Sequence, residues 1–338
     1  MQIGNFDTSK KVFIIAELSA NHAGSLKTAK DTVYAAKESG ADAIKLQTYT
    51  PEWMTLKIDR DEFKAGDLWK DEYLYDLYQK AMTPLEWHKE LFDYARSLEL
   101  EVFSSPFSKE AVDFLEQFEP PAYKIASFEI TDYDLIDYAA SKGRPMIIST
   151  GVATLQEIQD VADICKKRGV ELALLKCTSA YPTPRSEVNL KTIPAIKEIF
   201  NVEVGFSDHT LGISAPVAAA AMGARIIEKH FILDKNLNSP DKDFSLTPDE
   251  FKEMVMAVRE TEEMMGEVNF KPKSGRQFAR SLYVVKDIEK GETFSEENIK
   301  SIRPGYGLHP KYLPEILGKK ACKDLKKGDR LRWEDITD

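Results

Sequence analysis

Short apolar runs and longer amphipathic stretches alternate along the first two-thirds of the chain. Runs rich in β-branched and apolar side chains are typical of buried parallel strands, and the stretches between them have the spacing of covering helices. Eight runs predict strands: Val12–Leu18, Ala43–Leu46, Glu101–Ser104, Ala122–Ile125, Pro145–Ile148, Leu172–Lys176, Val202–Phe206 and Ile226–Lys229. Helices are expected between them, as at Leu26–Ser39 and Thr154–Arg168. Eight such units predict an α/β fold, a (β/α)8 TIM barrel.

The pattern changes at the segment GEVNFKPKSGRQFARS (266–281), which mixes glycine, proline and basic residues without a helix or strand period. Such a segment predicts a linker. Beyond it, KDIEKGETFSEENI (286–299) and KDLKKGDRLRWEDI (323–336) repeat one pattern, with a glycine expected at positive φ in each Lys-Gly turn. We therefore expect a barrel at 1–265, the linker, and a small domain of short strands and turns at 282–338.

Composition narrows the class of protein. The chain has 338 residues and a formal net charge of −10, without a run of lysine and arginine, so we expect no nucleic-acid partner. No apolar stretch approaches the ~20 residues of a membrane span, and no leader pattern opens the chain, which predicts a soluble, cytoplasmic protein without membrane contact. The cysteines, Cys165, Cys177 and Cys322, lack C-x-x-C spacing and are expected to be buried, reduced thiols.

Polar residues at the ends of the predicted strands are the candidates for chemistry, because TIM-barrel active sites lie where strands end. The first strand closes with AELSANHAGS, which offers Glu17. The second closes with KLQT, which places Lys45 and Gln47 on one face. A lysine in an apolar strand is costly to bury, so Lys45 is either half of a salt bridge or a cation for an anionic substrate.

Hydroxyl groups and a second lysine close the next three strands. FSSPFS offers Ser105, YKIASFE offers Lys124 and Ser127 with Glu129 beyond them, and STG offers Ser149. Each serine alone is equally consistent with a crowded strand end. Two lysines, several serines and adjacent backbone amides at one barrel mouth nevertheless predict a phosphate site.

The last three strands end in KCTSAYPTP, SDHT and EKHF. The first offers Ser179 and Tyr181, and the other two place His209 and His230 on neighbouring strands, about 4.8 Å apart. Two imidazoles with Glu17 as a nearby oxygen donor predict a site for Mn²⁺, Mg²⁺ or Co²⁺ rather than for structural zinc. Two hydrogen-bonded structural histidines are the alternative.

Other polar and aromatic residues near these motifs favour structural roles. His22 follows the first strand in a loop, and His88 lies in the helical stretch LEWHKELF. The aromatic run Trp69–Tyr78 predicts a packed excursion that shields the barrel mouth, with contact to a substrate as the alternative.

Eight motifs, taken in order along the chain, resemble those of the sialic acid synthase family, which condenses phosphoenolpyruvate with an amino-sugar aldehyde. The motifs are AELSANHAGS, KLQT, FSSPF, YKIASFE, STG, KCTSAYPTP, SDHT and EKHF. The tail, with RPGYGLHP and the Lys-Gly turns, is similar to the antifreeze-like (SAF) domain of these synthases. KCTSAYP, FARSLY and GLHP most resemble the branch that uses 2,4-diacetamido-2,4,6-trideoxy-L-altrose to make pseudaminic acid. N-acetylneuraminate or legionaminate synthesis, or non-catalytic sugar binding, are the alternatives.

The resemblance implies roles for individual residues. It implies phosphoenolpyruvate contacts from Lys45, Ser105, Lys124, Ser127, Ser149, Ser179 and Ser207, and sugar contacts from Glu17, Gln47, Glu129, Tyr181, Asp241, Phe278 and Arg303. The family commonly has threonine at position 105 and asparagine at position 179. His209 and His230 are expected to hold the divalent ion, with water activated by the ion or by Glu17, and Glu129 as the alternative base. The resemblance also implies a homodimer in which Arg303 of the partner subunit reaches the sugar from a swapped tail domain.

Overall fold

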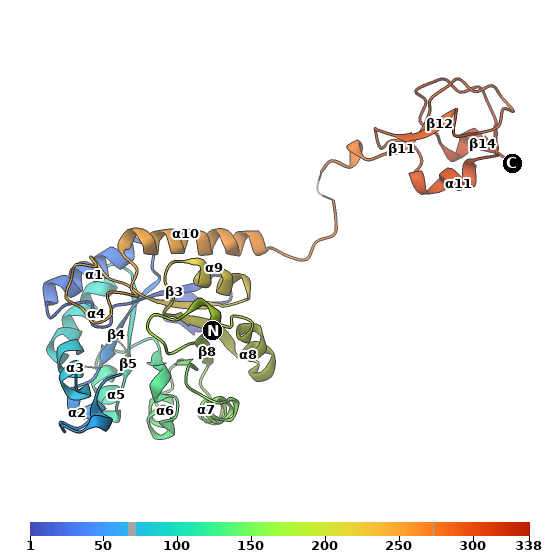
Figure 1. Cartoon of the computed structure of the whole chain (residues 1–338). Coiled ribbons are helices and arrows are strands. Elements are labelled where there is room, and N and C mark those ends of the chain that lie inside the picture. Colours follow the sequence, from blue (N-terminus) through green and yellow to red (C-terminus); the bar gives the residue numbers. More distant parts are fainter. Residues whose placement is uncertain (67–71, 273) are drawn as a thin grey trace. The chain divides into compact units, whose positions relative to one another are not determined.

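The computed structural model describes residues 1–66, 72–272 and 274–338, and the chain divides into two compact units, Met1–Gly266 and Glu267–Asp338. The first unit is a closed barrel of eight parallel strands (Figure 1). The strands are β3 (Phe13–Glu17), β4 (Ala43–Thr48), β5 (Glu101–Pro106), β6 (Tyr123–Ile125), β7 (Met146–Ser149), β8 (Leu172–Cys177), β9 (Glu203–Asp208) and β10 (Ile226–His230). Because β10 pairs with β3 and closes the ring, the predicted (β/α)8 barrel is confirmed.

Helices cover the outside of the barrel (Figure 1). They are α1 (Leu26–Glu38), α4 (His88–Ser97), α5 (Lys109–Glu116), α6 (Tyr133–Ala140), α7 (Leu155–Arg168), α8 (Thr192–Phe200), α9 (Ser214–Ala221) and α10 (Pro248–Met265), with the short α2 (Pro51–Met54) and α3 (Leu74–Ala81) after β4. Thr154 begins α7 by a capping box with Glu157. A two-stranded hairpin, β1 (Gln2–Ile3) and β2 (Phe6–Asp7), precedes the barrel. Over the described ranges, no helix is long and apolar enough to cross a membrane.

The barrel interior is apolar at one end and polar at the other. Phe13, Ile15, Phe103 and Ile147 point inward near the beginnings of their strands and form a buried cluster. Alternate strand residues point outward and pack against the helices in a larger cluster. Because successive side chains of a strand alternate between faces, the next inward positions fall at the strand ends, where the sequence places charged and hydroxyl residues.

The second unit has its own small core. It contains β11 (Ser281–Val284) paired with β12 (Ile299–Ile302), β13 (Lys320–Ala321) paired with β14 (Ile336–Thr337), and α11 (Leu313–Ile316). The two repeated motifs meet, since Ile288 and Leu325 exchange backbone hydrogen bonds of 2.9 and 2.8 Å. Gly291 and Gly328 have φ of 86° and 99°, which confirms the predicted glycine turns. Ser281, the last residue of the predicted linker, begins β11.

The cysteines and two of the histidines have structural surroundings. All three cysteines are free thiols; Cys165 and Cys177 are buried, but Cys322 is half-buried, so the expectation that every thiol is buried was wrong for the small domain. His88 is buried and lies 2.8 Å from Thr48 Oγ1 through Nε2. The Nε2 atom of His22, also buried, lies 3.3 Å from the Ala81 carbonyl oxygen.

Candidate active site

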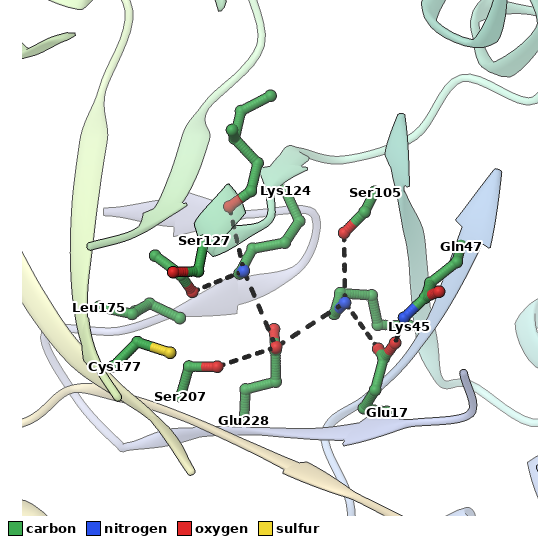
Figure 2. Close-up of polar contacts among 12 residues, drawn as sticks. Glu17, Lys45, Gln47, Ser105, Lys124, Ser127, Leu175, Cys177, Ser207 and Glu228 are labelled. Atoms are coloured by element: carbon green, nitrogen blue, oxygen red, sulfur yellow. Dashed lines mark hydrogen bonds and ion pairs between the residues drawn. The ribbon is translucent and has the colours of Figure 1, made fainter. Parts of the chain in front are cut away.

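A cluster of buried polar side chains lies above the apolar end of the barrel interior (Figure 2). Glu17 ends β3, Lys45 lies on β4, Lys124 on β6, and Glu228 on β10. All four point inward because they continue the period-two alternation of the apolar interior positions. Four charged groups thus lie close together inside the barrel, where the surrounding strands shield them from solvent.

Lys45 contacts two of the predicted strand-end residues, Glu17 and Ser105, and also Glu228. Its Nζ atom lies 2.7 Å from Glu17 Oε2 and 3.7 Å from Glu228 Oε1, and it donates a 3.2 Å hydrogen bond to Ser105 Oγ. Gln47 Nε2 donates to Glu17 Oε1 at 3.0 Å. The salt bridge expected under one interpretation of Lys45 is therefore present, and it lies within the group of residues expected to bind an anion.

Lys124 faces Lys45 across Glu228. It donates a 2.7 Å hydrogen bond to Ser149 Oγ, and its Nζ atom lies 3.8 Å from Glu228 Oε1. The two lysines thus share one carboxylate, and each also bonds to a serine hydroxyl at a strand end. This is an arrangement of donors suited to an anion with several oxygens.

The glycine of the STG motif leaves room for two further predicted serines. Ser127 Oγ and Ser179 Oγ lie 2.7 Å apart. A Cβ atom added at Gly151 would lie 2.5 Å from the first hydroxyl oxygen and 2.4 Å from the second. The absence of a side chain at position 151 therefore lets the ends of β6, β7 and β8 converge.

The two acidic residues of the cluster have opposite pKa shifts. Burial raises the pKa of Glu17 to about 7 against the opposing charge of Lys45, and the charge of Glu228 adds to the rise. Burial also opposes ionisation of Glu228, but Lys124 and Lys45 outweigh it and lower the pKa of that carboxyl. Glu228 is thus the permanent counter-ion of the lysines, while Glu17 can exchange a proton near neutrality.

His209 and His230 converge at the ends of neighbouring strands, with ring centroids 5.3 Å apart. His209 Nδ1 lies 3.3 Å from the Thr178 carbonyl oxygen. His230 Nδ1 is buried and has no hydrogen-bond partner among the described residues; it lies 3.8 Å from Asp241 Oδ2. Burial holds the pKa of His230 well below its ordinary value, which favours the neutral ring that metals bind.

The two imidazoles fit a divalent ion that takes its remaining ligands from oxygen. Across the part of the chain that the structure describes, no three His, Cys, Asp or Glu side chains come together in a group that could hold a metal ion. An ion with exchangeable positions for water or substrate suits the pair of rings and the orphaned Nδ1 atom of His230.

A cavity of about 400 Å³ opens beside the histidines. Predicted sugar contacts line it: Gln47, Glu129, Tyr181 and Asp241, together with Ser179 and His230. Burial raises the pKa of Glu129 to about 7 and also raises that of Asp241. These side chains therefore give the cavity two carboxyl groups, two hydroxyls and an amide beside His230.

Buried hydrogen bonds fix the loop that carries Asp241. Asn21 Nδ2 donates to the Phe231 carbonyl oxygen and to Ser245 Oγ, each at 2.9 Å, and Ser239 Oγ donates to Asn21 Oδ1 at 2.6 Å. The asparagine of the AELSANHAGS motif thus connects the loops after β3 and β10.

Two predicted sugar contacts lie outside the barrel unit. Phe278 is 64% exposed and Arg303 is exposed, and both belong to the second unit. Their segments run side by side, since Gly305 N donates to the Gln277 carbonyl oxygen at 3.0 Å. Their contact with the sugar stays a prediction.

Glu228 is the residue that sequence reasoning missed. It lies two positions before His230 in EKH, so it shares the inward face of β10, and Ser207 Oγ donates to its Oε1 atom at 3.3 Å. The period of two could have found it. The intervening Lys229 instead points away from the cluster and forms a fully buried 2.6 Å ion pair with Asp208, which ties β10 to β9.

The chain is similar to known proteins over nearly its whole length. The sequence profile of the NeuB family matches residues 32–270, and that of the SAF domain matches 279–337. The chain is 55% identical to a pseudaminic acid synthase of Campylobacter jejuni over 99% of this chain and 100% of that protein, and 52% identical to one of Helicobacter pylori over 96% and 97%. A solved N-acetylneuraminic acid synthetase of Leptospira borgpetersenii, crystallised with citrate, is 30% identical, with a TM-score of 0.74 over 82% of this chain and 93% of that one.

Proposed function

The chain belongs to the NeuB family, and from this membership we propose that it catalyses the pseudaminic acid synthase reaction. In that reaction phosphoenolpyruvate, 2,4-diacetamido-2,4,6-trideoxy-L-altrose and water give pseudaminic acid and phosphate. The observation that carries the proposal is the 55% identity to the Campylobacter jejuni synthase over practically the whole of both chains. Phosphoenolpyruvate is a cytoplasmic metabolite, so we place the reaction in the cytoplasm.

The buried lysine and serine cluster supports a site for phosphoenolpyruvate. Lys45 and Lys124 supply two positive charges, and Ser105 and Ser149 each already lie within hydrogen-bond distance of one of them. Ser127, Ser179 and Ser207 add hydroxyl groups to the same mouth. An anion that enters exchanges its water shell for these preorganised donors, which is favourable where water is excluded.

The divalent ion is proposed on His209 and His230. When bound there, it would supply Lewis-acid polarisation of the sugar aldehyde. Mn²⁺, Mg²⁺ and Co²⁺ all accept imidazole together with oxygen ligands. The positions of the two rings support this proposal, because both rings lie at the ends of neighbouring strands and the Thr178 carbonyl oxygen orients His209.

The reaction forms one carbon–carbon bond and breaks one carbon–oxygen bond. C3 of phosphoenolpyruvate bonds to the aldehyde carbon, whose oxygen takes up a proton. Water adds at C2, and the C2–O bond to phosphate breaks, so that phosphate leaves with the electron pair. The water gives up both of its protons, one to balance the proton taken up by the former aldehyde oxygen and one to the departing phosphate, and its oxygen becomes the C2 carbonyl oxygen. We propose Glu17 as the base, because its pKa of about 7 suits a group that takes a proton from water and returns it. Glu129, also near 7, is the alternative base.

The sugar is proposed to bind in the cavity beside the histidines. Gln47, Tyr181, Asp241 and Glu129 provide polar contacts to it. We further propose a homodimer in which Arg303 of the partner subunit and its tail domain complete the site, as the family resemblance implies. Phe278 is proposed to contact the sugar from the same tail domain.

Phosphate release tests the proposal. Purified protein with phosphoenolpyruvate, a divalent ion and the diacetamido sugar is expected to release one phosphate per sugar consumed, with pseudaminic acid identified by mass spectrometry and NMR. A comparable kcat/KM for N-acetylmannosamine or for the legionaminate precursor would move the substrate assignment to that sugar. Sugar binding without turnover of any of the three would overturn the enzyme assignment.

A further inference from the structure

Helix α3 has an apolar face that does not pack into the core. Leu74, Leu77, Tyr78 and Ala81 follow the i, i+3, i+4, i+7 spacing of one helix face. Every residue of this helix is described, and none is fully buried. All four instead line the cavity beside the histidines. The face that an amphipathic helix normally buries is thus a wall of the proposed sugar site.

Other elements extend this wall with apolar side chains. Met54 of α2, Phe107 after β5, and Phe128 line the same cavity. Buried Tyr49 contacts Phe107 and Tyr78 edge to face, with ring centroids 5.2 and 5.7 Å apart. These contacts fix the aromatic rings in place. Phe128 lines the cavity and is 58% exposed, so a bound ligand can cover part of its ring.

The cavity therefore has two kinds of lining. His230, Asp241 and Glu129 give it polar groups, beside which the aldehyde is proposed to react. Its apolar side chains come from the helices and loops that follow β4, β5 and β6. A ligand that matches this lining carries polar reacting groups as well as methyl groups.

We infer that the wall formed by Met54, Leu74, Leu77, Tyr78, Phe107 and Phe128 selects the sugar through its methyl groups. The inference rests on the proposed function. The diacetamido, 6-deoxy sugar bears two acetyl methyls and the C6 methyl. N-acetylmannosamine instead bears hydroxyls at C4 and C6, which would lose water against the side chains of Met54, Leu74, Leu77, Phe107 and Phe128 without gaining a hydrogen-bond partner from any of these five.

The size of the effect follows from general specificity limits. One methyl or hydroxyl more or less in an apolar pocket changes kcat/KM by about 10–200-fold. A polar residue in the wall is therefore expected to weaken use of the diacetamido sugar by a factor in that range. Because the lysine cluster lies elsewhere in the barrel mouth, the KM for phosphoenolpyruvate is expected to stay within about twofold of wild type.

Leu77→Asn tests the wall, with Leu56→Asn as the matched control. Leu56 follows α2, is 59% exposed and does not line the cavity, so its variant is expected to retain wild-type kinetics. Leu77→Asn is expected to lower kcat/KM for the diacetamido sugar about 10–200-fold. Leu77→Met, which keeps the side chain apolar, is expected to lose less. Met54→Gln from α2 supplies a second test should Leu77→Asn lower the Tm.

The outcomes separate this inference from the proposed function. Wild-type protein that releases no phosphate with the diacetamido sugar overturns the proposed function and the wall's role with it. An active wild type whose Leu77→Asn and Met54→Gln variants keep kcat/KM for the diacetamido sugar within twofold of the wild-type value overturns the inference alone. A parallel rise in the KM for phosphoenolpyruvate would likewise overturn it, because the wall would then support the whole site and not the sugar's methyl groups.

Discussion

Glu228 Oε1 lies 3.7 Å from the Nζ atom of Lys45, and both residues are buried inside the barrel. The same oxygen lies 3.8 Å from Lys124 Nζ. One carboxylate is therefore shared by two lysines that are proposed to bind an anionic substrate, and Glu17, 2.7 Å from Lys45, supplies a second carboxyl group. The arrangement lets a buried, positively charged site exist in the free protein, since an unpaired buried charge is strongly destabilising.

Replacing Glu228 by glutamine is expected to reduce the stability of the fold and to strengthen the binding of phosphoenolpyruvate. The side chain keeps its shape, but the two lysines lose their common counter-ion, and loss of one partner from a buried pair costs about 3–5 kcal/mol. Urea unfolding at pH 7 measures the change. The KM for phosphoenolpyruvate is expected to fall in folded protein, because the substrate then meets more positive charge.

Glu253→Gln on the exposed side of α10 is the control, with an expected change within about 0.5 kcal/mol. If Glu228→Gln unfolds at the same urea concentration as this control, the carboxylate does not balance the lysines and the interpretation of the cluster is wrong.

The barrel and many of its strand-end residues could be predicted from periodicity. Alternation fixes the face of Lys45, Lys124 and His209 once a strand is recognised, and parallel strands end together at one mouth. Glu228 shares that face and precedes His230 by two residues, but the prediction for EKHF named only the histidine. Its importance comes from facing two lysines of other strands.

Contacts made by loops could not be predicted from the residues themselves. Asp241 reaches the cavity because Asn21 and Ser239 connect two loops far apart in sequence, and no local pattern encodes that meeting. Likewise, the apolar spacing of Leu74, Leu77 and Tyr78 can be read in the sequence. Whether that face packs on a core or lines a cavity depends on the tertiary fold.

Trp69, from the same predicted aromatic excursion, lies outside the described residues.

Removal of the divalent ion is expected to abolish turnover. EDTA should stop phosphate release, and Mn²⁺, Co²⁺ or Mg²⁺ should restore it, because two imidazoles cannot replace the ion's polarising charge. His209→Ala and His230→Ala are each expected to lose at least about 100-fold in kcat/KM. Circular dichroism melts check that both variants stay folded.

His309→Ala provides the histidine control, since this exposed side chain belongs to the second unit. It is expected to keep both activity and metal dependence. Full activity in metal-free wild-type protein would rule out the metal site, and a collapsed melt for both alanine variants would favour purely structural histidines.

Glu129 is expected to make the protein less stable as the pH rises. Its pKa is about 7 in the folded chain against an ordinary value of 4.5, so the folded state binds the proton more tightly. This stabilisation is present in full below about pH 4.5 and is lost as the pH rises to about 7. Glu129→Gln removes the contribution. The variant's loss of unfolding free energy between pH 5 and pH 8 should therefore be smaller than the wild type's by about 1–3 kcal/mol.

Urea titrations at the two pH values measure both proteins, and Glu86→Gln in an exposed turn serves as the control. The difference between variant and wild type isolates Glu129, because the other buried carboxyl groups are common to both. Identical losses in the two proteins would show that Glu129 has an ordinary pKa, and the case for it as the alternative base would lose its main support.

The proposed exchange of tail domains predicts complementation between two proteins that are each nearly inactive at a low sugar concentration. His209→Ala removes a proposed metal ligand of the barrel, and Arg303→Ala removes the exposed arginine of the second unit. Arg303→Ala alone is expected to raise the sugar KM with little change in the KM for phosphoenolpyruvate. If Arg303 of the partner subunit completes each site, a mixed dimer contains one site in which the histidine and the arginine are both intact.

Random pairing of equal amounts makes half of the dimers mixed, with one of their two sites complete, so activity is expected to approach a quarter of wild type. Reversible dissociation and reassociation mix the subunits, and differently tagged chains report the exchange. If the arginine instead acts within its own chain, every site of every mixed dimer lacks one of the two residues. Activity that stays at the level of the separate variants, despite confirmed exchange, would therefore exclude the swapped arrangement. Recovered activity would come from the mixed dimers, because neither parent dimer contains a complete site.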